Sequence, residues 1–353
     1  MKYECSATLD WGYKGYRTLI LENDKIKVVI LLDKGSDIIE FVYKPLNLDV
    51  LWHSKFNTKS YPQLGHSLDT SSTAQDVYEG GWTDNLPVAG YMVKPHRGVR
   101  WGQLGETGLL PWECNIEKES DDGVSVTLST ECIRYPLKIS KNISLKNGES
   151  CLTITENIKN VSPVKLEYSW IQRPALGAPF LSPNCRVDLP AGIIENEIWN
   201  PPNRWSHLKP GHKSEWPYTL DKNEELVDLR IVPEKNVDRF EVTYAIMNEG
   251  WFAVTNPNIK LSFGMVWDKE VFPYLWFHQC YSYPDYPYFG RAWNLIPEPC
   301  TSWPNTFERQ IENGTIATIE GYETKSTTIR AVLHSGVQVV TNIDSDGKVS
   351  GEF

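Results

Sequence analysis

The segment LKISKNISLKNGESCLTITENIKN, residues 137–160, carries the pattern that decides the fold. Apolar and polar residues alternate on both sides of an Asn-Gly pair. A period of two residues is typical of a strand with one buried face, and Asn-Gly is favoured in the tight turn of a β-hairpin. We therefore predict two antiparallel strands, residues 137–145 and 150–160, which turn at Lys146-Asn147-Gly148.

The same pattern recurs along the chain. Residues 17–32 are predicted to form a hairpin that turns at 22–24. Further strands are predicted at residues 37–43, 124–130, 165–171, 228–232, 240–246, 251–255, 259–267, 315–322 and 325–333. Helical periodicity longer than two turns is absent, and prolines and glycines are spread without a linker. We expect residues 1–353 to form one all-β domain of two large antiparallel sheets packed face to face, with little helix and with both termini in sheets.

Composition narrows the class of partner. The chain has 353 residues, of which 41% are hydrophobic, and a formal charge of −10 from 45 acidic and 35 basic residues. Without a long basic tract, nucleic acids and anionic membranes are disfavoured as partners. No run of 18 apolar residues and no apolar signal region occur, which predicts a cytoplasmic protein. We expect it to be a monomer or a homodimer.

Seven cysteines are scattered without a Cys-x-x-Cys pair. An odd number without clustered spacing argues against a disulfide framework and against a structural zinc site. We expect reduced thiols and no metal.

A second segment, YLWFHQCYSYPDYPYFGRAWNLIPEPCTSWP (residues 274–304), is the best candidate for a binding site. Aromatic faces such as that of Trp276 pack against the C–H surface of a sugar ring, while the polar groups of Gln279, Asp285 and Glu298 bind its hydroxyls. Pro297 and Pro299 flank Glu298 and keep its backbone extended, as a general base requires. The alternative is an aromatic sheet core in which His278 is structural and Asp285 belongs to a turn.

Four segments resemble the galactose mutarotase-like superfamily, which includes the aldose 1-epimerases. They are residues 22–52, which begin ENDKIKVV, the Glu79-Gly80-Gly81-Trp82 motif with GETGLLPWE (105–113), SWIQRPALGAPFL (169–181) and IPEPCTSWP (296–304). Their order along the chain matches that of the superfamily. The resemblance implies a β-supersandwich with a sugar site in a groove on one sheet, and it requires no cofactor.

The resemblance also implies a reaction. A base removes the proton of the anomeric hydroxyl, an acid protonates the ring oxygen, and the opened sugar recloses as the other anomer. Glu298 matches the base. Relatives place histidine where this chain has Arg173, which stays protonated and transfers a proton poorly. A second histidine of the superfamily is also absent, because its His-Gly-Glu pattern reads Leu104-Gly105-Glu106 in this chain.

Three hypotheses follow. In the first, His278 or His96 supplies the proton beside Glu298 and Arg173. In the second, the sugar is anionic or modified, and Arg173 binds its charge together with Arg97 or Arg100. In the third, the protein binds a monosaccharide or sugar derivative without turnover. The residues expected to bind substrate in all three are Trp82, Arg97, Glu106, Gln172, Trp276, Gln279 and Asp285.

Overall fold

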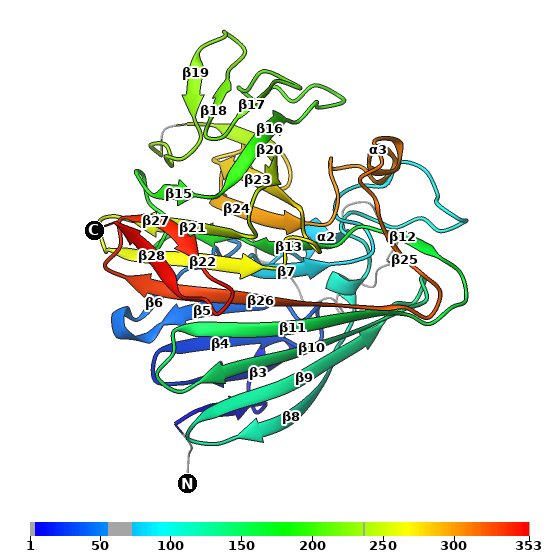
Figure 1. Ribbon diagram of the computed structural model, residues 1–353, viewed down its shortest axis with the longest axis vertical. Helices are drawn as coiled ribbons and strands as arrows, with labels where there is room; N and C mark the ends of the chain where they lie inside the picture. The colour runs from blue at the N-terminus through cyan, green and yellow to red at the C-terminus, as the bar shows by residue number, and fades with distance from the viewer. Residues whose placement is uncertain (1–3, 56–72, 236, 353) are drawn as a thin grey trace.

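The predicted hairpin forms at the centre of one of two large sheets in the computed structural model, which describes residues 4–55, 73–235 and 237–352. Leu137 pairs with Asn160 and Leu145 with Leu152. Among the described residues this sheet has eight strands (Figure 1). In spatial order they are β15 (Arg186–Asp188), β21 (Trp251–Asn256), β22 (Leu261–Trp267), β26 (Thr324–Ser335), β11 (Cys151–Asn160), β10 (Leu137–Lys146), β9 (Gly123–Glu131) and β8 (Glu113–Glu119).

The second large sheet has fourteen strands in the described chain. Its main path runs β1 (Ser6–Thr8), β3 (Tyr16–Glu22), β4 (Ile26–Leu31), β5 (Ile38–Tyr43), β7 (Trp82–Asn85), β13 (Ile171–Pro174), β24 (Trp293–Cys300), β23 (Tyr274–Tyr281), β20 (Arg239–Met247), β16 (Ala191–Asn196) and β17 (Lys213–Glu215). Three short strands attach to this path: β2 (Gly12–Tyr13), β6 (Leu48–Asp49) and β14 (Leu176–Gly177). All pairings in both sheets are antiparallel.

Small elements complete the described chain. The two-stranded sheets are β12 (Leu166–Tyr168) with β25 (Ala317–Ile319), β18 (Tyr218–Leu220) with β19 (Leu226–Asp228), and β27 (Val339–Ile343) with β28 (Val349–Glu352). The helices are η1 (Lys44–Leu46), α2 (Thr73–Asp76), η2 (Thr107–Leu109) and α3 (Phe307–Glu312). None of the helices in the described residues has the length and apolarity needed to cross a membrane.

The hydrophobic core lies between the two large sheets, which Figure 1 shows as stacked layers. Alternate residues of β10, such as Ile139 and Ile143, are buried there. Phe41 of one sheet packs edge-to-face on Phe263 of the other, with ring centroids 5.8 Å apart. Burying an aliphatic or aromatic side chain of this size stabilises the fold by about 1.5–3 kcal/mol, so this core holds the sheets together.

The prediction of an all-β fold with large antiparallel sheets and little helix is confirmed. Most predicted strands also form within a residue or two of their expected ends, including β3, β4, β9, β20, β22 and β26. The first strand joins the larger sheet and the last pairs with β27, so both ends of the described chain lie in sheets. That residues 1–353 form a single domain stays a prediction.

Three predicted strands are wrong in extent, each because local hydrogen bonds redirect the backbone. The strand predicted at 165–171 breaks after Tyr168, where Ser169 and Trp170 donate to Pro87 O and Thr301 Oγ1 and the chain passes from a small sheet to the large one. The strand predicted at 228–232 ends at Asp228, whose carboxylate accepts from the Arg230 backbone. The strand predicted at 315–322 is shortened to β25, because residues 315 and 316 donate to Gln310 O after α3.

Candidate functional site

Strands β13, β24 and β23 present two different faces of the larger sheet. Leu275 and Phe277 of β23 point into the core between the sheets. Trp276 and His278 alternate with them and point outward, and Trp276 lies directly opposite Glu298 on β24. Arg173 of β13 also points outward, because its side chain reaches Glu298. The strand alternation therefore gathers four predicted residues on the outer face.

Glu298 is the centre of this group. Its carboxylate is 2% exposed, and its Oε1 accepts a hydrogen bond of 2.9 Å from Nε of Arg173. Nδ1 of His278 lies 3.6 Å from the same oxygen, too far for a good hydrogen bond but within electrostatic range. No hydrogen bond from the described residues reaches Oε2. Glu298 is thus held through one oxygen, and the described residues leave the other without a hydrogen bond.

His278 carries a second uncommitted atom. The side chain is buried, and its Nε2 has no hydrogen-bond partner among the described residues. The imidazole packs edge-to-face on Phe240, at 4.8 Å between ring centroids. A buried nitrogen without a partner is costly unless a ligand or water satisfies it. His278 therefore brings an unsatisfied ring nitrogen to the lining of the pocket.

Arg173 is buried as deeply as the carboxylate it contacts, and its guanidinium lies 5.9 Å from the ring centre of Tyr78. Burial lowers the pKa of Arg173, but the charge of Glu298, its hydrogen bond and the nearby Tyr78 and Tyr288 together outweigh burial and leave this pKa above its ordinary value. Arg173 therefore stays charged. Its charge is paired with that of Glu298.

Pro297 and Pro299 fix the position of Glu298, as the sequence predicts. Both lie within β24, where a proline cannot donate to the ladder. Strand β24 pairs with β13 at Ile171–Cys300 and with β14 at Leu176–Leu295 and Gly177–Asn294, on either side of the two prolines. Arg173 reaches Glu298 across this interruption.

The outer face forms the floor of a pocket of about 570 Å³. Arg173, His278 and Glu298 lie on the floor between two apolar clusters: one includes Ile171 and Trp276, and the other includes Tyr78 and Ile296. Loops from several parts of the chain form the walls. The wall residues include Gln75, Tyr91, Gln103, Trp199, Asn203, Arg204, Trp205, Phe240, Tyr283, Asp285, Tyr286, Tyr288 and Asn305.

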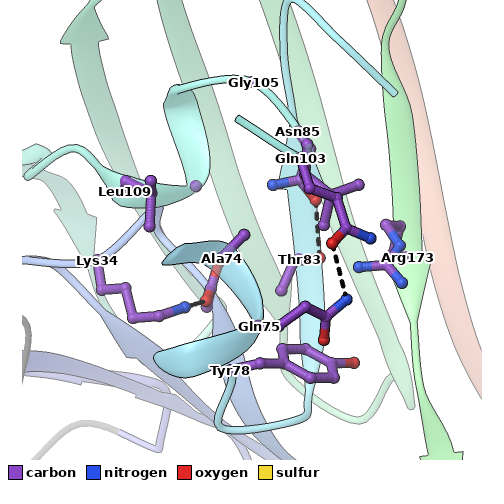
Figure 2. A pocket seen from close by; sticks show the side chains of 13 residues that line it. Lys34, Ala74, Gln75, Tyr78, Thr83, Asn85, Gln103, Gly105, Leu109 and Arg173 are labelled. Carbon is purple, nitrogen blue, oxygen red and sulfur yellow. Dashed lines mark hydrogen bonds and ion pairs between the residues drawn. The ribbon is translucent and has the colours of Figure 1, made fainter. Parts of the chain in front are cut away.

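A narrow chamber of about 20 Å³ adjoins the pocket behind Arg173, and Figure 2 shows its lining. Gln75 and Gln103 line both spaces, and Nε2 of Gln75 donates to Oε1 of Gln103 at 3.3 Å. Deeper in, the Tyr78 hydroxyl and Oδ1 of Asp37 are buried and have no hydrogen-bond partner among the described residues. Burial raises the pKa of both groups, so the Tyr78 phenol stays neutral. The chamber has the size and the polar groups to hold one water molecule.

Asp285 joins two wall loops. Its carboxylate accepts hydrogen bonds from Nη2 of Arg204, at 2.9 and 3.1 Å, and from Nε1 of Trp205, at 2.7 Å. Trp205 and then Arg204 lower the pKa of Asp285, so the carboxylate remains ionised. Asp285 lines the pocket as predicted, but most of its hydrogen-bonding capacity holds the loops together.

Four other predicted residues do not line the pocket. Gln172 and Trp82 point into the interior, where Trp82 donates to Gln172 and Gln172 donates to Glu156 of the eight-stranded sheet. Glu106 is fully buried and accepts from Trp101 and from the backbone of residues 133 and 134. Gln279 lies on the core face of β23, because it alternates with His278. Strand alternation assigns Gln172 and Gln279 to the face opposite their pocket-lining neighbours.

His96 and Arg97 also lie outside the pocket lining. Both bind Glu167, with His96 Nε2 at 3.1 Å and Arg97 Nη2 at 2.9 Å from its carboxylate oxygens. The His96 ring packs on Phe307. The two residues therefore connect a loop to β12 and do not join the group around Glu298.

A buried ionic network supports the floor from below. Nζ of Lys141 lies 2.6 Å from the carboxylate of Asp84 and 3.4 Å from that of Glu156. Burial and the neighbouring Asp84 raise the pKa of Glu156 well above its ordinary value. Gln172 connects this network to β13, one residue before Arg173. The network therefore positions the strand that carries Arg173.

Sequence reasoning did not identify most of the walls. Phe240, Trp199, Tyr78 and Tyr91 come from segments without a motif, whereas Tyr283 lies in the segment 274–304 that the sequence indicates. The sequence signal for these wall residues was the high content of tryptophan and tyrosine. This content indicates aromatic surface but does not show where in the fold that surface lies. Among the described residues, no group of three or more His, Cys, Asp or Glu side chains could hold a metal ion, and no cysteine forms a disulfide.

The fold is that of the galactose mutarotase-like proteins. A "putative aldose 1-epimerase" from Klebsiella pneumoniae superposes with a TM-score of 0.71 at 13% identity, covering 94% of this chain and 83% of the other. A galactose mutarotase-like protein from Clostridium acetobutylicum has a TM-score of 0.64 at 11% identity, covering 94% and 99%. One from Lactobacillus casei has a TM-score of 0.60 at 15% identity, covering 90% and 100%. These identities show the fold alone.

Residues 13–333 match the family described as a domain of unknown function (DUF4432), and the chain belongs to this family. A search of the curated proteins found no match.

Proposed function

We propose that the protein interconverts the anomers of an aldose in the pocket above Glu298. The observation that carries this proposal is the geometry of one carboxylate. Glu298 is buried on the pocket floor, held through Oε1 by Arg173, with Nδ1 of His278 3.6 Å from the same oxygen and with Oε2 unbonded by the described residues. The mutarotase-like fold and the names of the structural relatives support the same class of reaction.

The residues divide the reaction between them. Oε2 of Glu298 takes the proton from the anomeric hydroxyl, and His278 gives a proton to the ring oxygen, which opens the ring. The C1–C2 bond rotates and the two transfers reverse to close the other anomer. Arg173 stabilises negative charge that develops on the sugar. In this proposal His278 is the general acid, because Arg173 stays protonated and cannot perform that function.

The charges of the pocket favour a neutral sugar over an anionic one. Among the described wall and floor residues, Arg173 and Arg204 supply two positive charges, and Glu298 and Asp285 supply two negative charges. Each arginine is already paired with one of the carboxylates. An anion would gain little net attraction from paired charges.

The proposal is tested by anomer exchange, measured by saturation-transfer NMR over a panel of aldoses. Glu298→Gln keeps the shape of the side chain but removes the base. The protein's acceleration of anomer exchange should therefore fall by roughly 100- to 10,000-fold. Glu167→Gln is the matched control, because Glu167 also contacts a histidine and an arginine but lies outside the pocket. Equal exchange by the wild type and Glu298→Gln would show that Glu298 is not the base.

A second function, sugar binding without turnover, is favoured by one observation. The 2.9 Å hydrogen bond from Arg173 occupies one oxygen of Glu298, and Arg173 transfers a proton poorly. Calorimetry on the same panel separates the two functions. A sugar that binds without accelerated exchange supports the binding protein, and exchange that depends on Glu298 supports the enzyme.

A further inference from the structure

The pocket is larger than one sugar ring. A hexose has twelve heavy atoms and fills roughly 200 Å³ at the packing density of organic solids. The cavity of about 570 Å³ would hold such a ring beside Glu298 and leave more than half of its volume open. A site for a monosaccharide alone would leave the remaining wall without a ligand.

The two ends of the pocket differ in chemistry. Arg173, His278 and Glu298 are each less than 10% exposed and form the charged end. An aromatic wall, which we define as Phe240, Trp199 and Tyr283, leads away from them. Ring centroids are 4.8 Å apart from His278 to Phe240, 5.5 Å from Phe240 to Trp199, and 4.6 Å from Phe240 to Tyr283. All three rings of the wall are only partly buried and line the pocket.

The aromatic wall is held in place by hydrogen bonds. Nδ2 of Asn203 donates to the Phe240 carbonyl at 3.1 Å, and the Phe240 amide donates to the Trp205 carbonyl at 3.2 Å. Asp285 then connects Arg204 and Trp205 to the loop that carries Tyr283. A ligand would find these rings already positioned, which reduces the entropy lost on binding.

We propose that the substrate is a reducing disaccharide or longer reducing saccharide, with its reducing-end ring at Glu298 and its second ring against the aromatic wall. This inference rests on the proposed function. Partly exposed rings offer faces for the C–H surface of a pyranose. Asn203 and Arg204, beside the wall, offer donors for its hydroxyls. The second ring is joined through an atom other than the reducing-end C1, so the anomeric hydroxyl stays free to exchange.

The test compares three reducing disaccharides with glucose. The disaccharides are lactose, maltose and cellobiose, and glucose is the reducing-end ring of all three. Calorimetry measures the dissociation constants of the wild type and of Glu298→Gln, and NMR measures anomer exchange. We expect at least one disaccharide to bind about tenfold more tightly than glucose. Trp199→Ala should remove that gain without changing glucose binding, and Trp199→Phe should keep most of it. Trp11→Ala is the control, because Trp11 is 67% exposed and does not line the pocket.

The outcomes separate this proposal from the proposed function. Glucose binding and exchange without any gain from a second ring would overturn the disaccharide proposal and leave the proposed function standing. Tighter disaccharide binding that depends on Trp199, without accelerated exchange, would support the second-ring site and overturn the catalytic function. An equal loss of glucose and disaccharide binding in Trp199→Ala would show that Trp199 supports the pocket as a whole, and it would overturn the proposal.

Discussion

Two groups of the same three residue types have opposite surroundings in this protein. Arg173 and His278 meet Glu298 on the pocket floor, and Arg97 and His96 meet Glu167 at the surface. The side chains of the first group are 3–10% exposed, and those of the second are 22–38% exposed. Charges interact more strongly where water is excluded, whereas exposed pairs are screened. The same three residue types therefore form a candidate site only where they are buried beside an open cavity.

The largest difference between the two groups should be in stability. Arg173→Met leaves the buried carboxylate of Glu298 without its main partner, which should reduce the free energy of unfolding by about 3–5 kcal/mol. Arg97→Met removes an exposed partner and should cost no more than about 1 kcal/mol. Urea unfolding of both variants measures the difference. Similar losses in the two variants would mean that burial does not distinguish the groups.

The next difference concerns proton transfer. His278→Gln should slow anomer exchange by about 100-fold or more, because general acid catalysis contributes at least that much. His96→Gln should leave the rate unchanged. An effect of His96→Gln alone would place the acid in the surface group.

A smaller effect is expected from pH on the surface group. Partial burial raises the pKa of Glu167, but the hydrogen bonds from His96 and Arg97 outweigh it and lower the pKa below the ordinary 4.5. The lowered pKa stabilises the folded state above pH 4.5, and this contribution is lost as pH falls through the folded value. The unfolding free energies of wild type and Glu167→Gln should thus differ by about 1 kcal/mol or less at pH 7. The difference should shrink toward pH 3, and a difference that grows on acidification would contradict this reasoning.

The smallest effect tests the charge balance of the pocket. Glucose and its uronic acid should bind within about threefold of one another, because each arginine is already paired with a carboxylate. Calorimetry at low and high salt measures both affinities. A uronate preference that falls as salt rises would instead support the anionic substrate considered from the sequence.

Sequence patterns predicted the parts of the fold that have one buried face. Strands β9, β10, β11 and β26 each alternate between buried and less buried positions, and all were predicted. Strands β7 and β13 are buried on both faces, so they lack this alternation and were missed or displaced. These strands form the centre of the larger sheet, and β13 carries Arg173.

The candidate site was predicted unevenly for a related reason. Glu298 was identified because two prolines flank it and because its segment resembles the one that carries the general base in the superfamily. Gln279 was chosen beside His278, but adjacent residues of a strand face opposite sides of the sheet. His96 and His278 were equal candidates, since sequence distance to Glu298 does not indicate distance in space.

The sequence by itself determined the all-β class, the hairpin at residues 137–160 and the extended backbone around Glu298, because alternation, turn residues and prolines act over a few neighbouring residues. The resemblance to the superfamily already suggested that Arg173 and Glu298, 125 positions apart in the chain, share one site, and the tertiary structure brings them into direct contact. Only the tertiary structure decided that Phe240, Trp199 and Tyr283 form one wall. Those contacts depend on which strands become neighbours. That choice is made by packing of the whole core, and no local pattern encodes it.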